Sequence, residues 1–263
     1  MTTQSTTAIV LRSVEFSETS LVVTLLTRDL GRISAIAKGA RRPKGPFEGA
    51  LDLLSVCKVV VISKNASTLD LLTEAKLHRR FRGATRSLIR LHCGYYLVEL
   101  LRCLTEDHDP DAEVFDHTIA TLGLIDSEGP ALLALLHFES RLLQLLGLAP
   151  VLDRCADCGS KEIANSGRMF FESATGGVVC MACRSRQPSV VSISPAVLGH
   201  LATLVAAKRF VELPQDVVST IRADYSEFRS LLNRYLQHVC GRSLRMIELL
   251  PTQVKDAEAN SKE

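Results

Sequence analysis

Apolar residues in the first eighty positions occur in short runs that are separated by turn residues. Such runs cover 8–11, 21–27, 32–38, 56–62 and 69–75. Five short strands with turns between them, within about 80 residues, are typical of a small β-barrel. The five-stranded oligonucleotide/oligosaccharide-binding barrel, or OB-fold, has this size. Because the order of the strands cannot be read from the sequence, an SH3-like barrel stays open as an alternative.

The spacing of apolar residues then changes from that of strands to that of helices. Apolar side chains recur every three or four residues from about 82 to 105, which predicts a long amphipathic helix. Further helices are predicted over 112–122, 130–146, 195–207, 214–222 and 225–239. Pro130 and Pro195 suit the first turns of two of them, and Gly241 suits the end of the last. The sequence therefore predicts an α+β protein whose helical part follows an N-terminal barrel.

Residues 151–187 interrupt the helical spacing and contain two Cys-x-x-Cys pairs. A two-residue gap lets both thiolates of a turn reach one metal ion, and zinc prefers four such ligands in a tetrahedron. The pairs therefore predict one structural Zn2+ ion, held by Cys155, Cys158, Cys180 and Cys183. Because the protein supplies all four ligands, no position is left for a substrate. Chance spacing and a redox dithiol are the alternatives, but neither pair opens a helix in a βαβ context.

A zinc-dependent deaminase is a further alternative, because such enzymes combine His-x-Glu with a later Cys-x-x-Cys pair. This chain has His137 and Glu139 ahead of Cys155 and Cys158. However, no proline directly precedes Cys155, the spacing is short, and the second cysteine pair would have no role. The simpler interpretation places His137 and Glu139 in a leucine-rich helix. We therefore expect a protein that is not an enzyme.

The net charge of +2 conceals an uneven distribution. Residues 1–90 hold 15 Lys and Arg against seven Asp and Glu, so that the front third carries a net charge of +8. Two clusters stand out, one in a Gly- and Pro-containing loop after residue 37 and one at 78–86, and Lys58 and Lys76 can add to them. A polyanion would be drawn to this part of the chain. The predicted DNA-binding residues are Arg32, Lys38, Arg41, Arg42, Lys44, Arg79, Arg80, Arg82 and Arg86.

Aromatic residues that could stack on bases are few in this region. Phe16, Phe47 and Phe81 are the only candidates in the first 90 residues that the sequence suggests for this role. Many charges with little stacking predict binding that is sensitive to salt and tolerant of base sequence. The competing interpretation is that such charge runs form ordinary solvated surface.

Neither a membrane span nor a secretory signal is predicted. The chain has no run of about 18 apolar residues, and its start lacks a basic segment followed by a long apolar stretch. We therefore expect a cytoplasmic protein, associated with the nucleoid if it binds DNA. Reducing conditions there favour metal binding over disulfides for the clustered cysteines.

Four segments of the chain resemble the bacterial RecO recombination mediators. They are TTAIVLRSVEFSETSLVVTLLTRDLGRISAIAKGARRPKGPFEGAL near the start, the arginine-rich stretch at 78–82, LLGLAPVLDRCADCG, and CMAC at 180–183. The resemblance covers about 1–245. It implies an N-terminal OB-fold, a helical body and a zinc-bearing insertion. It also places Lys38, Arg41, Arg42 and Lys44 in the family's basic loop, and makes the four cysteines its zinc ligands.

The resemblance further implies a function and a set of partners. Members of the family bind single- and double-stranded DNA, promote annealing and act with RecR. They engage the C-terminal tail of single-strand binding protein and help to load RecA at gaps. No short motif marks the pocket for that tail, so its residues are not predicted. The alternative from a different class is a zinc-ribbon regulator or scaffold that acts mainly through protein contacts.

These inferences give one predicted layout of domains. The predicted parts are an OB-fold nucleic-acid-binding domain over 1–80, an α-helical domain over 81–150 and 188–245, a small ribbon-like zinc-binding insertion over 151–187, and a disordered tail over 252–263.

Overall fold

The structure is a computed structural model that describes residues 2–42, 45–47, 49–63, 69–163 and 167–254. It divides the chain into two compact units, Met1–Asp126 and Ser127–Glu263. The division falls inside 81–150, which the sequence analysis assigned to one helical domain, and the predicted domain boundaries stay predictions. Most of the predicted tail, 255–263, lies outside the described residues. Among the described residues, no helix combines the length and apolarity needed to cross a membrane.

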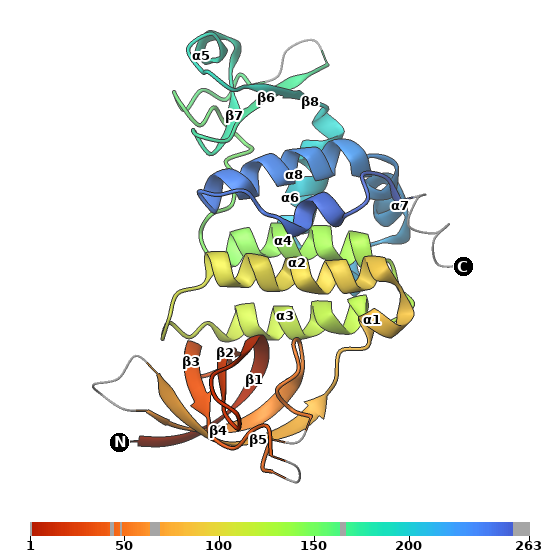
Figure 1. Cartoon of the computed structure of the whole chain (residues 1–263). Coiled ribbons are helices and arrows are strands. Elements are labelled where there is room, and N and C mark those ends of the chain that lie inside the picture. The colour runs from red at the N-terminus through yellow and green to blue at the C-terminus, as the bar shows by residue number, and fades with distance from the viewer. Residues whose placement is uncertain (1, 43–44, 48, 64–68, 164–166, 255–263) are drawn as a thin grey trace. The chain divides into compact units, whose positions relative to one another are not determined.

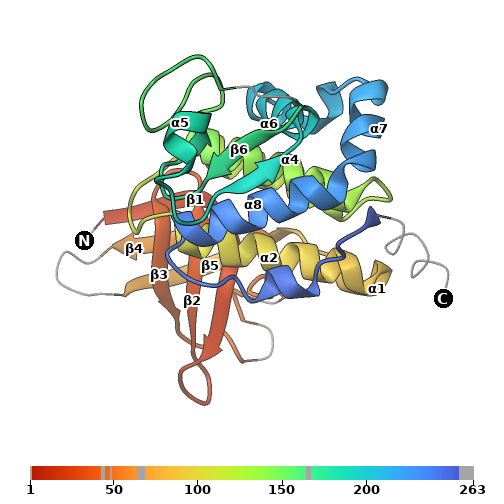
Figure 2. The same cartoon turned by 90° about the horizontal axis from the view of Figure 1, so that it is seen from above.

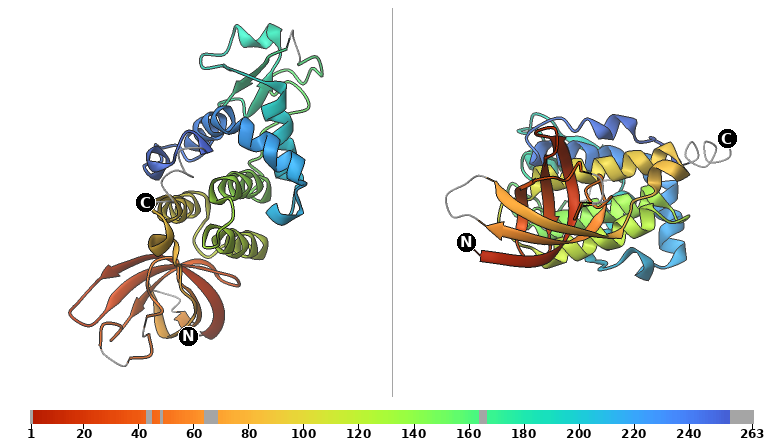
Figure 3. Two further views of the ribbon diagram at one scale, coloured as in Figure 1. Left: turned by 90° about the vertical axis from the view of Figure 1, so that its right-hand side faces the viewer. Right: turned by 60° about the horizontal axis from the view of Figure 1, so that its bottom comes forward.

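The first unit begins with a closed barrel of five strands (Figures 1 and 3). The strands are β1 (Thr2–Glu15), β2 (Leu21–Thr27), β3 (Gly31–Ala37), β4 (Val56–Ser63) and β5 (Asp70–Arg79). Their order around the barrel is β1-β2-β3-β5-β4, and β1 pairs with both β2 and β4. Strands β3 and β5 pair in parallel, whereas the other pairs are antiparallel. This closed barrel fits an OB-like fold.

Alternation of side chains explains why these segments are strands. Along β3, every second residue from Gly31 to Ala37 is buried, because successive side chains of a strand point to opposite faces. The inward residues of the five strands pack into one apolar core that includes Val10, Val23 and Ile33. The register of β1 against β2 shifts between Val10 and Arg12, and an irregularity of this kind bends a strand so that it can pair on both sides.

The described residues of the first unit also form three helices: α1 (Gly83–Arg86), α2 (Leu88–Leu104) and α3 (Ala112–Ile125). The single helix predicted from about 82 to 105 is interrupted at Ser87. That residue is extended, and its hydroxyl accepts a hydrogen bond from the Arg90 backbone N–H, so Ser87 caps a new helix. Residue 31 must be glycine, because its φ is +69° and an added Cβ would lie 2.5 Å from the Asp109 backbone nitrogen.

The second unit combines helices with a small sheet (Figure 2). Its α-helices are α4 (Ala131–Leu145), α5 (Met181–Arg184), α6 (Pro195–Ala206), α7 (Gln215–Ala223) and α8 (Tyr225–Val239). Its strands are β6 (Met169–Glu172), β7 (Gly177–Val179) and β8 (Val191–Ile193), in the order β7-β6-β8. Two short 3-10 helices, η1 (Phe210–Glu212) and η2 (Met246–Leu249), follow α6 and α8.

A buried ion pair joins two of these helices. The Arg229 Nη2 of α8 donates to the Glu139 Oε1 of α4 over 2.6 Å, and both side chains are almost completely buried. His137, also on α4, is buried and has its Nε2 atom 3.0 Å from the carbonyl oxygen of Ala207. Polar side chains therefore form specific contacts inside the helical part of this unit.

Candidate metal centre and nucleic-acid interface

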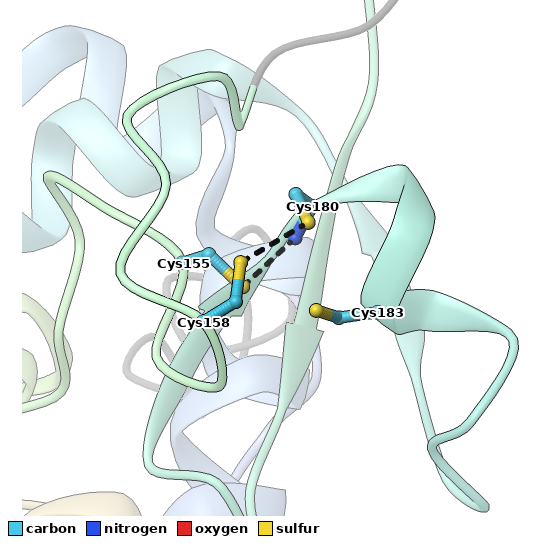
Figure 4. A group of neighbouring side chains, drawn as sticks. All are labelled: Cys155, Cys158, Cys180 and Cys183. Carbon is cyan, nitrogen blue, oxygen red and sulfur yellow. Dashed lines mark hydrogen bonds between the residues drawn. The ribbon is translucent and has the colours of Figure 1, made fainter.

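The four predicted zinc ligands come together in the second unit (Figure 4). The sulfur atoms of Cys155, Cys158, Cys180 and Cys183 all lie within 4.8 Å of one another. The Cys158 and Cys180 sulfurs are 3.7 Å apart. Four sulfurs placed tetrahedrally at about 2.3 Å from zinc would be about 3.8 Å from each other. The cluster could therefore hold one metal ion.

Two local structures present the cysteines in pairs. Cys155 and Cys158 lie on a tight turn in which the Gly159 N–H donates to the Cys155 carbonyl oxygen, and Gly159 has a φ of +76° that favours glycine. Cys180 is the N-cap of α5, and Cys183 lies within that one-turn helix. The backbone N–H of Cys180 also donates to the Cys155 sulfur over 3.3 Å. The turn and the helix thus aim their sulfurs at a common point.

The surroundings of the sulfurs separate their pKa values. Burial raises the pKa of the Cys155 thiol, but backbone N–H groups of Cys158, Cys180 and Asp157 outweigh it and lower the pKa to about 6. Hydrogen bonding to Asp157, followed by burial, raises the pKa of Cys183 to about 12. In the absence of a cation, Cys155 therefore loses its proton more readily than Cys183. A bound cation would favour the thiolate form of its ligands.

The cysteines also form most of one small apolar cluster within 151–187. Three of the five buried residues in this apolar cluster are Cys155, Cys180 and Cys183, and the other two are Phe170 and Val179. Arg184 stacks over the Phe170 ring at 4.0 Å from its centroid. So few apolar side chains make a weak core, which is why a small module of this kind benefits from a metal ion.

One neighbour of the cluster was not predicted. Arg186 donates from Nη2 to the Cys183 sulfur over 3.1 Å and forms an ion pair with Asp157 at 3.3 Å. A cation at this position offsets part of the negative charge of a tetrathiolate site. The only signal in the sequence was an arginine three residues after the last cysteine, which by itself does not indicate such a contact.

His137 and Glu139 do not take part in the cysteine cluster. Both lie on α4, where His137 contacts the Ala207 carbonyl and Glu139 pairs with Arg229. The one group of candidate metal ligands found among the described residues consists of cysteines alone. The structure therefore gives no support to the deaminase alternative.

Part of the predicted DNA-binding set lies at one end of the barrel, directly after β3. Lys38, Arg41 and Arg42 are exposed there. The Arg41 backbone N–H donates to the Thr19 carbonyl oxygen over 3.1 Å, so the loop is attached to the turn between β1 and β2. Lys44 belongs to the same predicted loop but lies outside the described residues.

A second part of the set lies at the far end of β5. Ala37 pairs with Leu72, and Arg79 follows seven residues later, which places the two basic clusters roughly 23 Å apart along the strand. Arg80, Arg82 and Arg86 are exposed at this second end.

Two lysines lie between the two basic clusters. Lys58 of β4 and Lys76 of β5 are exposed and stand directly opposite each other, with Glu74 as an exposed acidic neighbour. Like charges placed opposite each other destabilise a sheet, so this face carries an electrostatic cost that a polyanion would relieve. One pair of exposed lysines therefore lies between the two basic clusters, and Glu74 separates it from the loop after β3.

Two of the predicted DNA-binding arginines are partly buried and make structural contacts. Arg41 and Arg80 also form ion pairs, with Glu15 and Asp52, but both stay exposed. Arg32 donates to Asp107 over 2.6 Å and to the Arg102 carbonyl oxygen over 2.8 Å. Arg79 donates to the Ile119 carbonyl oxygen over 3.2 Å. Arg32 also lies at the start of β3, at the end opposite to Lys38. Both arginines join the barrel to the helices of the first unit.

The fold and the site together define a class of protein with two different parts. One part contains an OB-like barrel with exposed basic residues, and the other contains helices and a four-cysteine cluster that could hold a metal ion. Sequence models of one family match both parts of the chain. The model described as Recombination protein O N terminal matches residues 1–81, and the model described as Recombination protein O C terminal matches residues 85–246.

Individual relatives agree with the family models. A protein from Rhodopirellula baltica named DNA repair protein RecO is 48% identical, over 94% of this chain and 98% of its own length. Proteins of the same name from Myxococcus xanthus and Anaeromyxobacter dehalogenans are 35% and 34% identical, over 92% and 90% of this chain and 95% and 92% of their own lengths. The chain belongs to the RecO family of DNA repair and recombination proteins. The predicted family resemblance is thereby confirmed.

Proposed function

We propose that this protein is a DNA-binding recombination mediator. It binds single- and double-stranded DNA through the barrel, anneals complementary strands and acts with RecR. In this role it helps to load RecA onto DNA coated with single-strand binding protein, whose C-terminal tail it engages, during repair of gaps and double-strand breaks. Family membership supports this proposal. The observation that carries it in the structure is the exposed basic loop of Lys38, Arg41 and Arg42, attached to the β1–β2 turn at one end of an OB-like barrel.

The charge pattern of the barrel suits annealing. Two complementary strands repel each other, and a positive surface that contacts phosphates lowers that repulsion. Contacts to phosphates leave the base edges available for pairing. Exposed basic residues at both ends of β5, with Lys58 and Lys76 between them, would let a strand follow the barrel surface. Such a protein makes and breaks no covalent bonds, and it acts in the cytoplasm at the nucleoid.

The role proposed for the metal is structural. We infer that the ion is a single Zn2+, because four cysteine sulfurs this close together can surround one ion and zinc prefers four such ligands in a tetrahedron. Since the protein provides all four ligands, the ion would organise the module of 151–187 and would not activate a water molecule.

A double substitution in the basic loop tests the function. Arg41→Ala with Arg42→Ala is expected to weaken binding of oligothymidine, because two phosphate contacts are lost. The slope of log affinity against log salt concentration should flatten by about 1.4, since each contact to a single strand contributes about 0.7. Fluorescence anisotropy with a labelled oligonucleotide, at several salt concentrations, measures both quantities.

Arg28→Ala is the matched control, because Arg28 lies in the turn after β2 and its guanidinium pairs with Asp116. It should leave the salt slope unchanged. If the loop variant binds with the same affinity and slope as the unmodified protein, the assignment of the loop is wrong. If the unmodified protein shows no affinity for DNA even at low salt, the mediator proposal fails and a scaffold that acts through protein contacts takes its place.

A further inference from the structure

The barrel exposes one aromatic ring beside its basic loop. Of the three phenylalanines that the sequence suggested for stacking, Phe47 is buried in the barrel core and Phe81 is partly buried, close to Gly83 and Gly94. Phe16 is 63% exposed. Single exposed apolar side chains are common on protein surfaces, so the exposure of Phe16 gains meaning only from the groups that lie beside it.

The turn that holds Phe16 is fixed by hydrogen bonds. The Phe16 N–H donates to the Ser20 carbonyl oxygen over 3.0 Å, and the Ser20 N–H donates to the Ser17 hydroxyl over 3.2 Å. The Ser17 N–H also donates to the Ser20 carbonyl oxygen, over 3.3 Å. This turn joins β1 to β2 at the rim of the barrel. The ring is thus presented from a defined turn, which lowers the entropy cost of ordering it on a ligand.

Cationic groups are attached to the same turn. The Arg41 backbone N–H donates to the Thr19 carbonyl oxygen over 3.1 Å, and its guanidinium lies 3.4 Å from the Ser17 carbonyl oxygen and 3.1 Å from Glu15. Leu21 pairs with Ala37, so Lys38 follows directly at this end of the barrel. An exposed aromatic ring and several positive charges therefore share one rim, at the β1–β2 loop that OB-folds use for oligonucleotides.

From this juxtaposition we propose that Phe16 stacks on an unpaired base of single-stranded DNA while Lys38, Arg41 and Arg42 contact the flanking phosphates. The inference rests on the proposed function and adds a preference for single strands to it. Bases within a duplex are already stacked on each other and offer no free face to the ring. Every unpaired base, in contrast, can offer a free face. Stacking of this kind tolerates any base sequence.

Replacement of the ring gives the first test. Phe16→Ala should weaken binding of oligothymidine roughly 5- to 150-fold, the range expected for loss of one base–aromatic stack. Its affinity for a duplex of equal length should stay within about twofold, and the salt slope should not change, because no phosphate contact is removed. Phe16→Tyr keeps an aromatic ring and should restore the single-strand affinity.

The absence of tryptophan from the sequence gives a second and more direct test. Phe16→Trp creates a single indole at the proposed contact, and stacking on thymine should quench its fluorescence as oligothymidine is added. Val211→Trp is the matched control, since Val211 is 64% exposed and lies in the second unit. Its fluorescence should not respond.

The outcomes separate this inference from the proposed function. If the protein binds oligothymidine while Phe16→Ala retains full affinity and Phe16→Trp is not quenched, the stacking role is wrong and the mediator function stands. If single-strand and duplex affinities fall equally in Phe16→Ala, the ring does not select single strands. If no variant, nor the unmodified protein, binds DNA, both proposals fail, and the exposed ring is better explained as a protein contact.

Discussion

At the scale of single residues, His137 shows how burial sets a charge. Burial lowers the pKa of its imidazole, and the hydrogen bond to the Ala207 carbonyl opposes this only in part. The ring is therefore neutral in the folded protein at a pH where an exposed histidine already takes up a proton. In the unfolded chain, the pKa returns to about 6.5.

This difference predicts a dependence of stability on pH. Below about pH 6.5 the unfolded chain binds a proton at His137 that the folded protein does not bind, so the free energy of unfolding decreases as the pH falls. The His137→Gln variant lacks this loss. Between pH 7.5 and pH 5.5, the free energy of unfolding of the unmodified protein should fall by up to about 1.4 kcal/mol more than that of the variant. Urea unfolding at both pH values measures the difference, and equal decreases in the two proteins would contradict the assignment.

At the scale of elements, the ion pair between Glu139 and Arg229 links α4 to α8 from inside the second unit. The two groups are 90 residues apart in sequence, and their charged atoms are 2.6 Å apart. A buried pair adds little stability compared with a well-packed apolar pair, because both charges lose their hydration. Loss of one partner is costly, however, because it leaves the other charge buried.

A set of substitutions distinguishes these two effects. Arg229→Met alone should lower the free energy of unfolding by about 3–5 kcal/mol, because the Glu139 carboxylate loses its countercharge. The combination of Glu139→Leu with Arg229→Met should cost much less than the single change. Chemical unfolding of the single and double variants gives this comparison. A double variant that is as unstable as the sum of its parts would show that the two side chains act independently.

Most helices and strands could be predicted because each is marked by the spacing of apolar residues within its own short segment. Residues 21–27 were predicted as a strand and form one, and 225–239 were predicted as a helix and form one. Strand β1 extends further toward the N-terminus than its apolar run, because polar residues from Thr2 onward pair with β4. The interruption of the helix at Ser87 was not predicted. The helical spacing of apolar residues continues through this position, and the cap is visible only in the backbone.

The site was predictable only where the ligands are close in sequence. Two short cysteine pairs predicted the cluster, and the structure confirms that the four sulfurs meet. The roles of single arginines were not predictable from charge runs. Arg32 pairs with Asp107 and Arg41 with Glu15, and those partners are fixed only by folding. Exposure likewise singles out Phe16 among three candidate rings, and no local pattern marks it.

At the scale of the whole molecule, the chain consists of parts that are stabilised in different ways. The barrel has its own apolar core, which includes residues from all five strands. The module of 151–187 instead relies on sulfur atoms for most of its buried cluster. Loss of a metal ion should therefore affect one part of the chain and leave the other intact.

Cys155→Ser tests this separation in the full-length protein. The variant should lose its bound zinc, and backbone amides within 151–187 should exchange with solvent faster, since metal binding and folding of the module are coupled. Amides of the barrel strands should keep their protection. Cys240→Ser, outside the cluster, should retain the metal. Elemental analysis and hydrogen exchange with mass spectrometry report both effects, and an unaltered zinc content in Cys155→Ser would refute the ligand set.

The pairing of β1 with strands on both sides has a consequence for synthesis on the ribosome. Thr2 pairs with Ser63, and the ring closes only through β5, which ends at Arg79. Contacts between residues so distant in sequence form late, because a long segment must lose its freedom first. The nascent chain therefore has to expose the apolar edges of its early strands until about eighty residues have emerged from the exit tunnel, a period when chaperones could shield them.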